Sequence, residues 1–189
     1  MLFIFDMGGV VSRCADVIPS IAEILEISEE KFFQIAGKNW TDLLCGRLSS
    51  KQFWNHFSRK IHREIKEDLF ELYFHPILNP EVIAIIRELK QKFRIVCGTN
   101  TVRIHYQIHL KRGDYSIFDQ VYASHLLGIA KPDPRFYRYI LEKENTKVEN
   151  AFFIDDTLEN VIAARYLGIR SIHFTDSISL KDELGKYQL

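Results

Sequence analysis

Asp6 is the first residue in the sequence whose type and position could do chemistry. It ends a short apolar run at positions 2–5 and is followed closely by Gly8 and Gly9. Glycines let backbone N–H groups approach an anion closely, as they do in phosphate-binding loops. The alternative interpretation is a turn in which the Asp6 carboxylate caps the next segment, because a Gly-Gly pair is also common in turns.

Asp155 and Asp156 form a second acidic position, again directly after an apolar run, at 151–154. Two adjacent carboxylates repel each other unless a positive charge offsets the repulsion. Magnesium often does so, because it binds one or two carboxylates together with water and substrate phosphate. The pair therefore indicates a cation site, which Asn160 could support. Alternatively, one aspartate caps the helix that begins near Leu158, and Asn160 is a surface residue.

Thr99 and Asn100 follow a third apolar run, at 94–98, and offer a hydroxyl and an amide to phosphate oxygens. Lys131 stands in the sequence AKPDP, where two prolines restrict the chain before a helical pattern. A positive charge held rigidly beside an anion is what phosphoryl transfer requires. Taken alone, each of these residues could equally be an ordinary turn residue or a solvated lysine.

Short apolar runs without polar alternation are typical of strands that are buried on both faces of a parallel sheet. The sequence contains five such runs, at 2–5, 94–98, 121–123, 151–154 and 171–174. Each of them stops at small or polar residues, so the residues described above are expected at strand ends.

Helical patterns lie between these runs, at 80–92, 134–143 and 158–167, with Asn79 and Gly168 as candidate caps. Alternating strands and helices with right-handed crossovers predict an α/β fold with a doubly wound parallel sheet. In such sheets ligands bind beyond the carboxyl ends of the strands. The polar residues after the apolar runs are therefore expected to form one site.

The segment from Ser12 to Asn79 breaks this alternation, because it contains no strand-like run. Its amphipathic helical stretches lie at about 17–26, 29–36, 50–62 and 64–74. We therefore predict an α/β core formed by residues 1–11 and 80–189, with a small helical module at 12–79 over the end of the sheet.

The composition argues against several classes of protein. The 189 residues, 47% of them hydrophobic, suffice for one domain with a modest insertion. Equal numbers of basic and acidic residues, 25 of each, argue against a nucleic-acid partner.

No apolar run reaches the roughly 18–20 residues of a membrane helix, and the N-terminus lacks a secretory pattern, so we expect a cytoplasmic protein. Cys14, Cys45 and Cys97 are widely spaced without a CxxC pair, which argues against a disulfide framework or a zinc site.

The order of these features resembles the four motifs of the haloacid dehalogenase (HAD) superfamily. The motifs are strand-Asp-x-x-Gly, strand-Thr, Lys-Pro before a helix, and strand-Asp-Asp, and the match spans residues 1 to about 175. One HAD subfamily carries an α-helical cap between its first and second motifs, which agrees with the helical segment. The sequences FDMGGVV, TNTVRIH, LGIAKPDPRFYRYIL and FFIDDTLENVIAARYLGI resemble the sugar-phosphatase branch that includes bacterial α-glucose-1-phosphate phosphatases.

The resemblance implies a phosphatase that hydrolyses a small phosphorylated metabolite, with a sugar phosphate as the expected substrate. Asp6 would attack phosphorus and form an aspartyl-phosphate intermediate. Thr99, the Asn100 amide and Lys131 would stabilise the charge of the transferring group. A Mg²⁺ ion would be held by the Asp6 carboxylate, the Gly8 carbonyl, and Asp155 and/or Asp156. In the helical segment, Trp40 and Arg47 would be substrate contacts, whereas the other aromatic residues are expected in its core and His105 is expected to be a plain helix residue.

Gly8 departs from the pattern of most HAD phosphatases, which carry a second aspartate two residues after the nucleophile. That aspartate protonates the leaving oxygen and then activates water, and such groups contribute about 10²–10⁴ in rate. Without it, cleavage would depend on the leaving group's own ability to carry negative charge.

The missing aspartate leaves other functions open. A metal-independent haloacid dehalogenase also lacks it, but would give Asp155 and Asp156 no role. A non-catalytic phospho-ligand sensor and a phosphosugar mutase are further alternatives, although the mutase reaction also uses the second aspartate. Metal-dependent turnover of a phosphate ester separates these functions. The oligomeric state is left open by the sequence.

Overall fold

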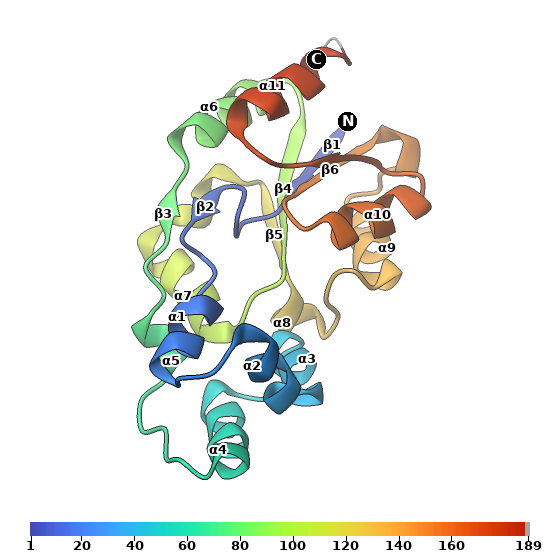
Figure 1. Cartoon of the computed structure of the whole chain (residues 1–189). Helices are drawn as coiled ribbons and strands as arrows, with labels where there is room; N and C mark the ends of the chain where they lie inside the picture. Colours follow the sequence, from blue (N-terminus) through green and yellow to red (C-terminus); the bar gives the residue numbers. More distant parts are fainter. Residues whose placement is uncertain (188–189) are drawn as a thin grey trace.

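A five-stranded parallel sheet lies at the centre of the computed structural model, which describes residues 1–187 (Figure 1). The strands lie in the order β5-β4-β1-β6-β7, and every neighbouring pair is parallel. Their bounds are β1 (Leu2–Phe5), β4 (Arg94–Thr99), β5 (Gln120–Ala123), β6 (Ala151–Asp155) and β7 (Arg170–His173). The predicted α/β fold with a doubly wound parallel sheet is confirmed.

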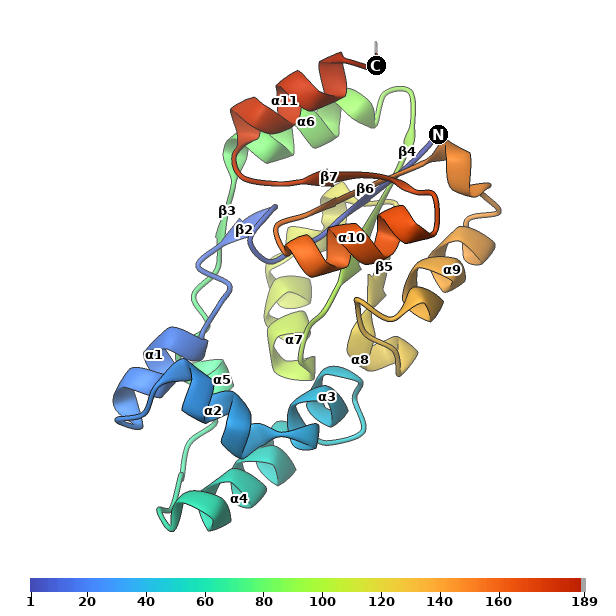
Figure 2. The same ribbon diagram turned by 45° about the vertical axis from the view of Figure 1, so that its right-hand side comes forward.

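Helices cover both faces of the sheet (Figure 2). Their bounds are α6 (Pro80–Leu89), α7 (Arg103–Arg112), α8 (Ser124–Leu127), α9 (Pro134–Lys143), α10 (Leu158–Tyr166) and α11 (Ser177–Gly185), with the 3₁₀ helices η1 (Asp114–Ile117) and η2 (Val148–Asn150). Because strand side chains alternate between the faces, Phe3 and Phe5 pack with α6 and α11, whereas Leu2 and Ile4 pack with α9 and α10. All four side chains are buried, which explains why the first strand is apolar throughout.

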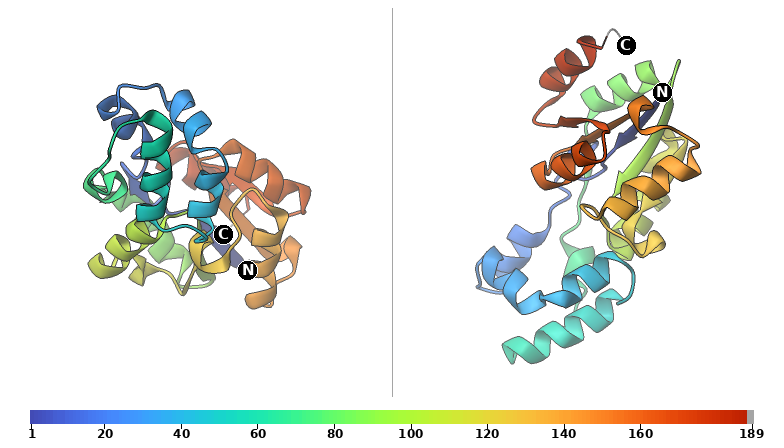
Figure 3. Two further views of the ribbon diagram at one scale, coloured as in Figure 1. Left: turned by 90° about the horizontal axis from the view of Figure 1, so that it is seen from below. Right: turned by 90° about the vertical axis from the view of Figure 1, so that its right-hand side faces the viewer.

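The remaining helices lie together beyond the carboxyl ends of the strands (Figure 3). They are α1 (Ile18–Ile24), α2 (Glu29–Ala36), α3 (Lys38–Leu44), α4 (Ser50–Ile61) and α5 (Leu69–Leu72). We call them the cap helices. Three of them begin at a side chain that accepts a hydrogen bond from a free N–H group, namely Ser28, Ser49 and Asp68. The boundaries proposed for the core and the cap, with residues 12–79 in the cap, remain a prediction.

The expectation that no strand lies between Ser12 and Asn79 is wrong. Strand β2 (Ser12–Arg13) pairs with β3 (Ile77–Leu78) in a two-stranded antiparallel sheet. These strands are the two connections between the central sheet and the cap helices, and they lie side by side (Figure 1). Strands of two residues carry no periodic pattern, so the sequence could not reveal them.

The helix expected at 64–74 is also wrong in length, because it is helical only over α5. The Asp68 carboxylate accepts hydrogen bonds from the Phe70 N–H and from Nε1 of Trp54. These bonds start α5 at a fixed place and tie it to α4. The chain before Asp68 connects the two helices.

An aromatic cluster forms the core of the cap helices, as the sequence predicts for most of these residues. Phe32, Phe53, Trp54 and Phe57 are buried, whereas Phe33 is exposed. The ring centroids of Trp54 and Phe70 lie 4.5 Å apart, which is close to the stacking distance of aromatic pairs. Side chains of α7 join this cluster and thereby attach the cap helices to the core. Within residues 1–187, no helix combines the length and the apolar character needed to cross a membrane.

Candidate active site

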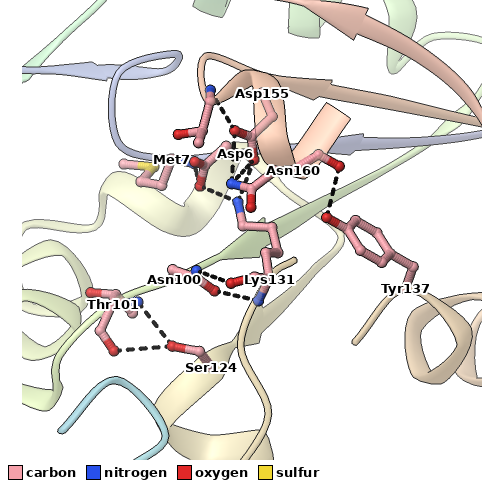
Figure 4. Close-up of polar contacts among 10 residues, drawn as sticks. Asp6, Met7, Asn100, Thr101, Ser124, Lys131, Tyr137, Asp155 and Asn160 are labelled. Atoms are coloured by element: carbon pink, nitrogen blue, oxygen red, sulfur yellow. Dashed lines mark hydrogen bonds and ion pairs between the residues drawn. The ribbon is translucent and has the colours of Figure 1, made fainter. Parts of the chain in front are cut away.

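The carboxyl ends of three adjacent strands bring the predicted site residues together (Figure 4). Asp6 directly follows β1, Thr99 ends β4 and Asp155 ends β6. Because β1 lies between β4 and β6 with its residues in register, these positions share one edge of the sheet. The strands therefore fix the spacing of the side chains before any contact forms among them.

Lys131 provides a buried positive charge at this edge. Its Nζ lies 3.0 Å from Oδ1 of Asp6 and 2.6 Å from Oδ2 of Asp155. Burial alone would disfavour the charge, but the two carboxylates raise the pKa of Lys131 above its usual value. The side chain of Asn100 holds the Lys131 backbone, because its Nδ2 donates to the Lys131 carbonyl and its Oδ1 accepts from the Lys131 N–H, each at 2.8 Å.

The Asp155 carboxylate is fully engaged within the protein. Its Oδ1 accepts hydrogen bonds from the Thr157 N–H at 2.8 Å and from Nδ2 of Asn160 at 3.1 Å. Its Oδ2 accepts from Lys131 and, at 3.2 Å, from the same amide of Asn160. Tyr137 in turn donates its hydroxyl to the Asn160 carbonyl at 2.9 Å. Asp155 thus orients Lys131, and Asn160 is part of the site.

Asp6 and Asp156 hold carboxylate oxygens that remain available. Oδ1 of Asp6 accepts from the Met7 N–H at 2.7 Å, whereas Oδ2 of Asp6 and both carboxylate oxygens of Asp156 have no hydrogen-bond partner among the described residues. Oxygen atoms of Asp6, Asp155 and Asp156 lie within 4.8 Å of one another.

Burial and the neighbouring charges shift the pKa of the carboxyl groups in this cluster. Burial, with further repulsion from Asp155 and Asp156, raises the pKa of Asp6 to about 7, although Lys131 opposes the shift. Burial and the charge of Asp155 also raise the pKa of Asp156. The cluster therefore has more negative charge than Lys131 balances, and an added cation would relieve it.

The two glycines after Asp6 differ in what they require. Gly9 has a φ of +73°, and a Cβ at this position would lie 2.0 Å from Oδ2 of Asp156. A side chain at Gly9 would therefore both strain the backbone and displace Asp156. A Cβ at Gly8 would lie 3.4 Å from the Cβ of Ala15, and Gly8 does not need the left-handed conformation.

A cavity of about 910 Å³ lies between this edge of the sheet and the cap helices. Asp6, Thr99 and Lys131 line it on the side of the sheet, and Trp40 of α3 and Arg47, between α3 and α4, line it on the side of the cap helices. The roles of Trp40 and Arg47 as substrate contacts remain a prediction. The side-chain amide of Asn100 is occupied by Lys131. The predicted contact between Asn100 and phosphate therefore remains a prediction for the backbone N–H of Asn100.

Hydrogen bonds of Ser124 and Arg47 join the segment at the end of α3 to loops of the core. Ser124 Oγ donates to the Leu44 carbonyl at 2.7 Å and accepts from the Thr101 N–H at 3.0 Å. Arg47 Nη1 donates to the Gly128 carbonyl at 3.3 Å. The cap helices are thus held against the loops that follow β4 and β5.

Several residues that line the cavity were not expected from the sequence, among them Asp16, His109 and Tyr115. His105, expected as a plain helix residue, also lines the cavity, donates from Nε2 to the Phe70 carbonyl at 2.8 Å and stacks on Phe74. Burial lowers the pKa of His105 to about 4. These positions depend on contacts between α7 and the cap connections, for which the sequence offers no local signal.

Comparison with known proteins places this fold and site in one class. The sequence model of the haloacid dehalogenase-like hydrolase family matches residues 1–168 of the chain. The chain therefore belongs to the haloacid dehalogenase-like hydrolase family. The family, the fold and a hydrolase activity agree with the sequence-based predictions, whereas the roles of individual site residues remain predictions.

Two curated relatives and one crystal structure illustrate the family. The sesquiterpene phosphatase astK of Aspergillus oryzae is 27% identical over 186 residues, which cover 96% of this chain and 93% of the relative. A phosphorylated carbohydrates phosphatase of Thermotoga maritima is 27% identical over 188 residues, covering 90% of this chain and 82% of the relative. A HAD family enzyme of Bacteroides thetaiotaomicron, crystallised with magnesium and inorganic phosphate, superimposes with a TM-score of 0.73 at 22% identity, over 92% and 93% of the two chains.

Proposed function

We propose that the protein is a Mg²⁺-dependent phosphatase that acts on a small phosphate ester through an aspartyl-phosphate at Asp6. The observation that carries the proposal is the buried Lys131 ammonium, which contacts both Asp6 and Asp155. An Asp6 carboxylate held in this way is oriented and remains close to a positive charge that can balance an incoming phosphate.

The residues of the chain support each part of this reaction. An oxygen of Asp6 attacks phosphorus and the bond to the leaving oxygen breaks, after which water attacks the same phosphorus and releases Asp6. Lys131 stabilises the negative charge on the transferring group, together with Thr99 and the Asn100 N–H at the end of β4.

The donor atoms of the site fit a hard divalent cation. We infer that Mg²⁺ is held by the carboxylates of Asp6 and Asp156 and by the Gly8 carbonyl, because Asp155 is occupied by Lys131, Thr157 and Asn160. When bound, Mg²⁺ supplies positive charge that offsets the carboxylates and the phosphate. The magnesium and phosphate complex of the structurally similar enzyme from Bacteroides thetaiotaomicron agrees with this choice.

A sugar phosphate is the substrate class that we propose. The resemblance of the motifs to sugar phosphatases supports it, as does the relative from Thermotoga maritima that is named for phosphorylated carbohydrates. The cavity of about 910 Å³ combines apolar walls, such as Trp40 and Leu44, with the polar side chains of Arg47 and Asp133. The relative named for sesquiterpenes makes isoprenoid phosphates the second class to test.

The alternatives explain less of the site. A metal-independent dehalogenase would also attack through Asp6, but it would leave the carboxylate oxygens of Asp156 without a function. A phospho-ligand sensor would need no oriented nucleophile. A phosphosugar mutase remains the hydrolase's nearest alternative in mechanism, because it also forms a phosphoenzyme.

The test is phosphate release from a panel of phosphorylated metabolites with Mg²⁺, without Mg²⁺ and with a chelator. We expect turnover that requires Mg²⁺, its loss in Asp6→Asn, and a mass adduct at Asp6 with beryllium fluoride. Asp182→Asn, an exposed site on α11, is the matched control and should retain wild-type rates. Wild-type rates in Asp6→Asn would contradict the nucleophile, and turnover unaffected by chelator would contradict the metal.

A further inference from the structure

Gly8 leaves the proposed phosphatase without an acid at the usual place, and we propose that Asp16 supplies it. Asp16 would protonate the leaving oxygen and then take a proton from the attacking water. This inference rests on the proposed function and adds a catalytic residue to it.

The position of Gly8 points toward the chain around Asp16. A Cβ at Gly8 would lie 3.4 Å from the Cβ of Ala15, which directly precedes Asp16. The space that a longer side chain at Gly8 would enter is therefore occupied by the connection between β2 and α1. Asp16 lines the same cavity as Asp6 and Lys131.

The Asp16 carboxylate is oriented and has an oxygen to offer. Its Oδ1 accepts a hydrogen bond from the Ile18 N–H at 3.0 Å, at the beginning of α1. Its Oδ2 accepts no hydrogen bond from residues 1–187. The pairing of β2 with β3 holds the chain just before Asp16, so the carboxylate sits on an anchored connection.

Most other acid–base groups of the cavity are committed elsewhere. Asp133 pairs with Arg135. Asp155 holds Lys131, and Asp156 is a proposed metal ligand. His105 donates to the Phe70 carbonyl, and His109 Nδ1 lies 2.8 Å from Oδ2 of Asp114. The hydroxyl of Tyr115 has no partner among the described residues, but a phenol so deeply buried ionises even less readily than usual. Besides Asp6 and Asp156, two carboxylates of the cavity, Asp16 and Glu159, thus keep an oxygen without a partner among the described residues. Of these, Asp16 directly follows Ala15, the residue that a Cβ at Gly8 would meet, so Asp16 is the one that we assign to the proton exchange.

The proposed reaction has two steps, formation and hydrolysis of the aspartyl-phosphate. In the first, Asp6 forms a bond to phosphorus, the bond to the leaving oxygen breaks, and the Asp16 carboxylic acid gives its proton to that oxygen. In the second, the Asp16 carboxylate takes a proton from water, the water oxygen bonds to phosphorus, and the bond from phosphorus to Asp6 breaks. The enzyme returns to its initial state, with alcohol and phosphate released.

The test compares 4-nitrophenyl phosphate with 4-nitrobenzyl phosphate in wild type and Asp16→Asn. The two esters are similar in shape, but the benzyl alkoxide needs a proton to leave and the nitrophenolate does not. We expect kcat/KM for the benzyl ester to fall by about 10²–10⁴ in Asp16→Asn, and kcat/KM for the phenyl ester to change little. Because the second step also loses its base, we expect a burst of nitrophenolate equal to the enzyme concentration.

The variants separate this role from a structural one. In Asp16→Asn the side chain keeps an oxygen that can accept from the Ile18 N–H. Asp16→Ser is a second variant whose side-chain oxygen can accept the same hydrogen bond. The matched control is Asp176→Asn, since Asp176 caps α11 through the N–H groups of Ile178 and Ser179 and lies outside the cavity. This control should leave kcat/KM for both esters unchanged.

The outcomes are distinguishable. Equal losses for both esters, or no loss for the benzyl ester in Asp16→Asn and Asp16→Ser, would overturn the role of Asp16 while the phosphatase stands. Failure of the wild type to hydrolyse either ester or any phosphorylated metabolite with Mg²⁺ would overturn the proposed function itself.

Discussion

Nζ of Lys131 and Oδ1 of Asp6 lie 3.0 Å apart, and the Lys131 side chain has no exposed surface. The ammonium therefore interacts with the carboxylate at an effective dielectric constant well below that of water. Either charge would be costly to leave unpaired, and the same contact orients the carboxylate that we propose as the nucleophile.

Lys131→Met should accordingly abolish turnover and destabilise the protein. The change leaves buried carboxylates without their cation, and breaking a buried pair typically costs about 3–5 kcal/mol. Urea unfolding without Mg²⁺ measures this loss. Lys181→Met, at an exposed lysine of α11, should stay within about 0.5 kcal/mol of wild type. Equal stability of the two variants would mean that the ion pair contributes nothing.

Asp155→Asn and Asp156→Asn should have different effects on stability without metal. The repulsion between the two adjacent charges alone would predict that either change stabilises the protein. Asp155→Asn removes a charge that faces Lys131, so we expect lower stability without metal. Asp156→Asn removes a repelled charge, so we expect equal or higher stability without metal and a smaller shift of Tm on adding Mg²⁺. A bound ligand at a hundredfold excess over its Kd contributes about 2.7 kcal/mol. An undiminished Mg²⁺ shift in Asp156→Asn would place the metal elsewhere.

Gly9→Ala should be far more harmful than Gly8→Ala. A Cβ at Gly9 meets Asp156 at 2.0 Å and requires a φ of +73°, whereas the contact at Gly8 is 3.4 Å without that requirement. We expect Gly9→Ala to lose Mg²⁺-dependent turnover and at least about 1 kcal/mol of stability, and Gly8→Ala to keep both within a few fold. Calorimetric Mg²⁺ titration and thermal unfolding measure the effects. Comparable behaviour of the two variants would contradict the packing of Gly9 against Asp156.

His105 should make the protein less stable as the pH falls. Its pKa is about 4 when folded and near 6.5 when unfolded, so the unfolded chain binds more protons between these values. Stability is thus lost as the pH decreases from about 6.5 to 4, by up to about 3 kcal/mol. The raised pKa of Asp6 changes stability with pH in the opposite direction. The Asp6 contribution is the same in wild type and His105→Gln, so the difference between the two stability curves reports His105 alone. Parallel stability curves for the two proteins over this range would contradict the prediction.

The sequence predicts the residues at the strand ends because each follows an apolar run that must be buried on both sides of the sheet. Asp6, Thr99 and Asp155 therefore meet wherever β1, β4 and β6 are neighbours. The sequence does not predict which carboxylate contacts Lys131. Thr157 and Asn160 hold the Asp155 carboxylate where it meets Lys131, whereas the Asp156 carboxylate has no hydrogen-bond partner within residues 1–187.

The parts that escaped prediction are formed by long-range contacts. Strands β2 and β3 pair across the whole set of cap helices, and two residues in each strand are too few for a pattern. Asp16 lines the cavity from the connection that follows this pairing. A lone aspartate ahead of a helix is typical of an N-cap in any sequence, whereas here the N-cap of α1 is Val17, and Asp16 precedes it and accepts from the Ile18 N–H.

Asn100 gives the site a further property. Its carboxamide offers the same donor and acceptor as a peptide group and binds both the N–H and the carbonyl of Lys131 at 2.8 Å. The side chain thus binds the loop at Lys131 by the same two bonds that a peptide group of a neighbouring strand could make, directly after the end of β4. In the proposed reaction the charge of Lys131 would therefore need no reorientation when a phosphate arrives, which would keep that cost out of the reaction barrier.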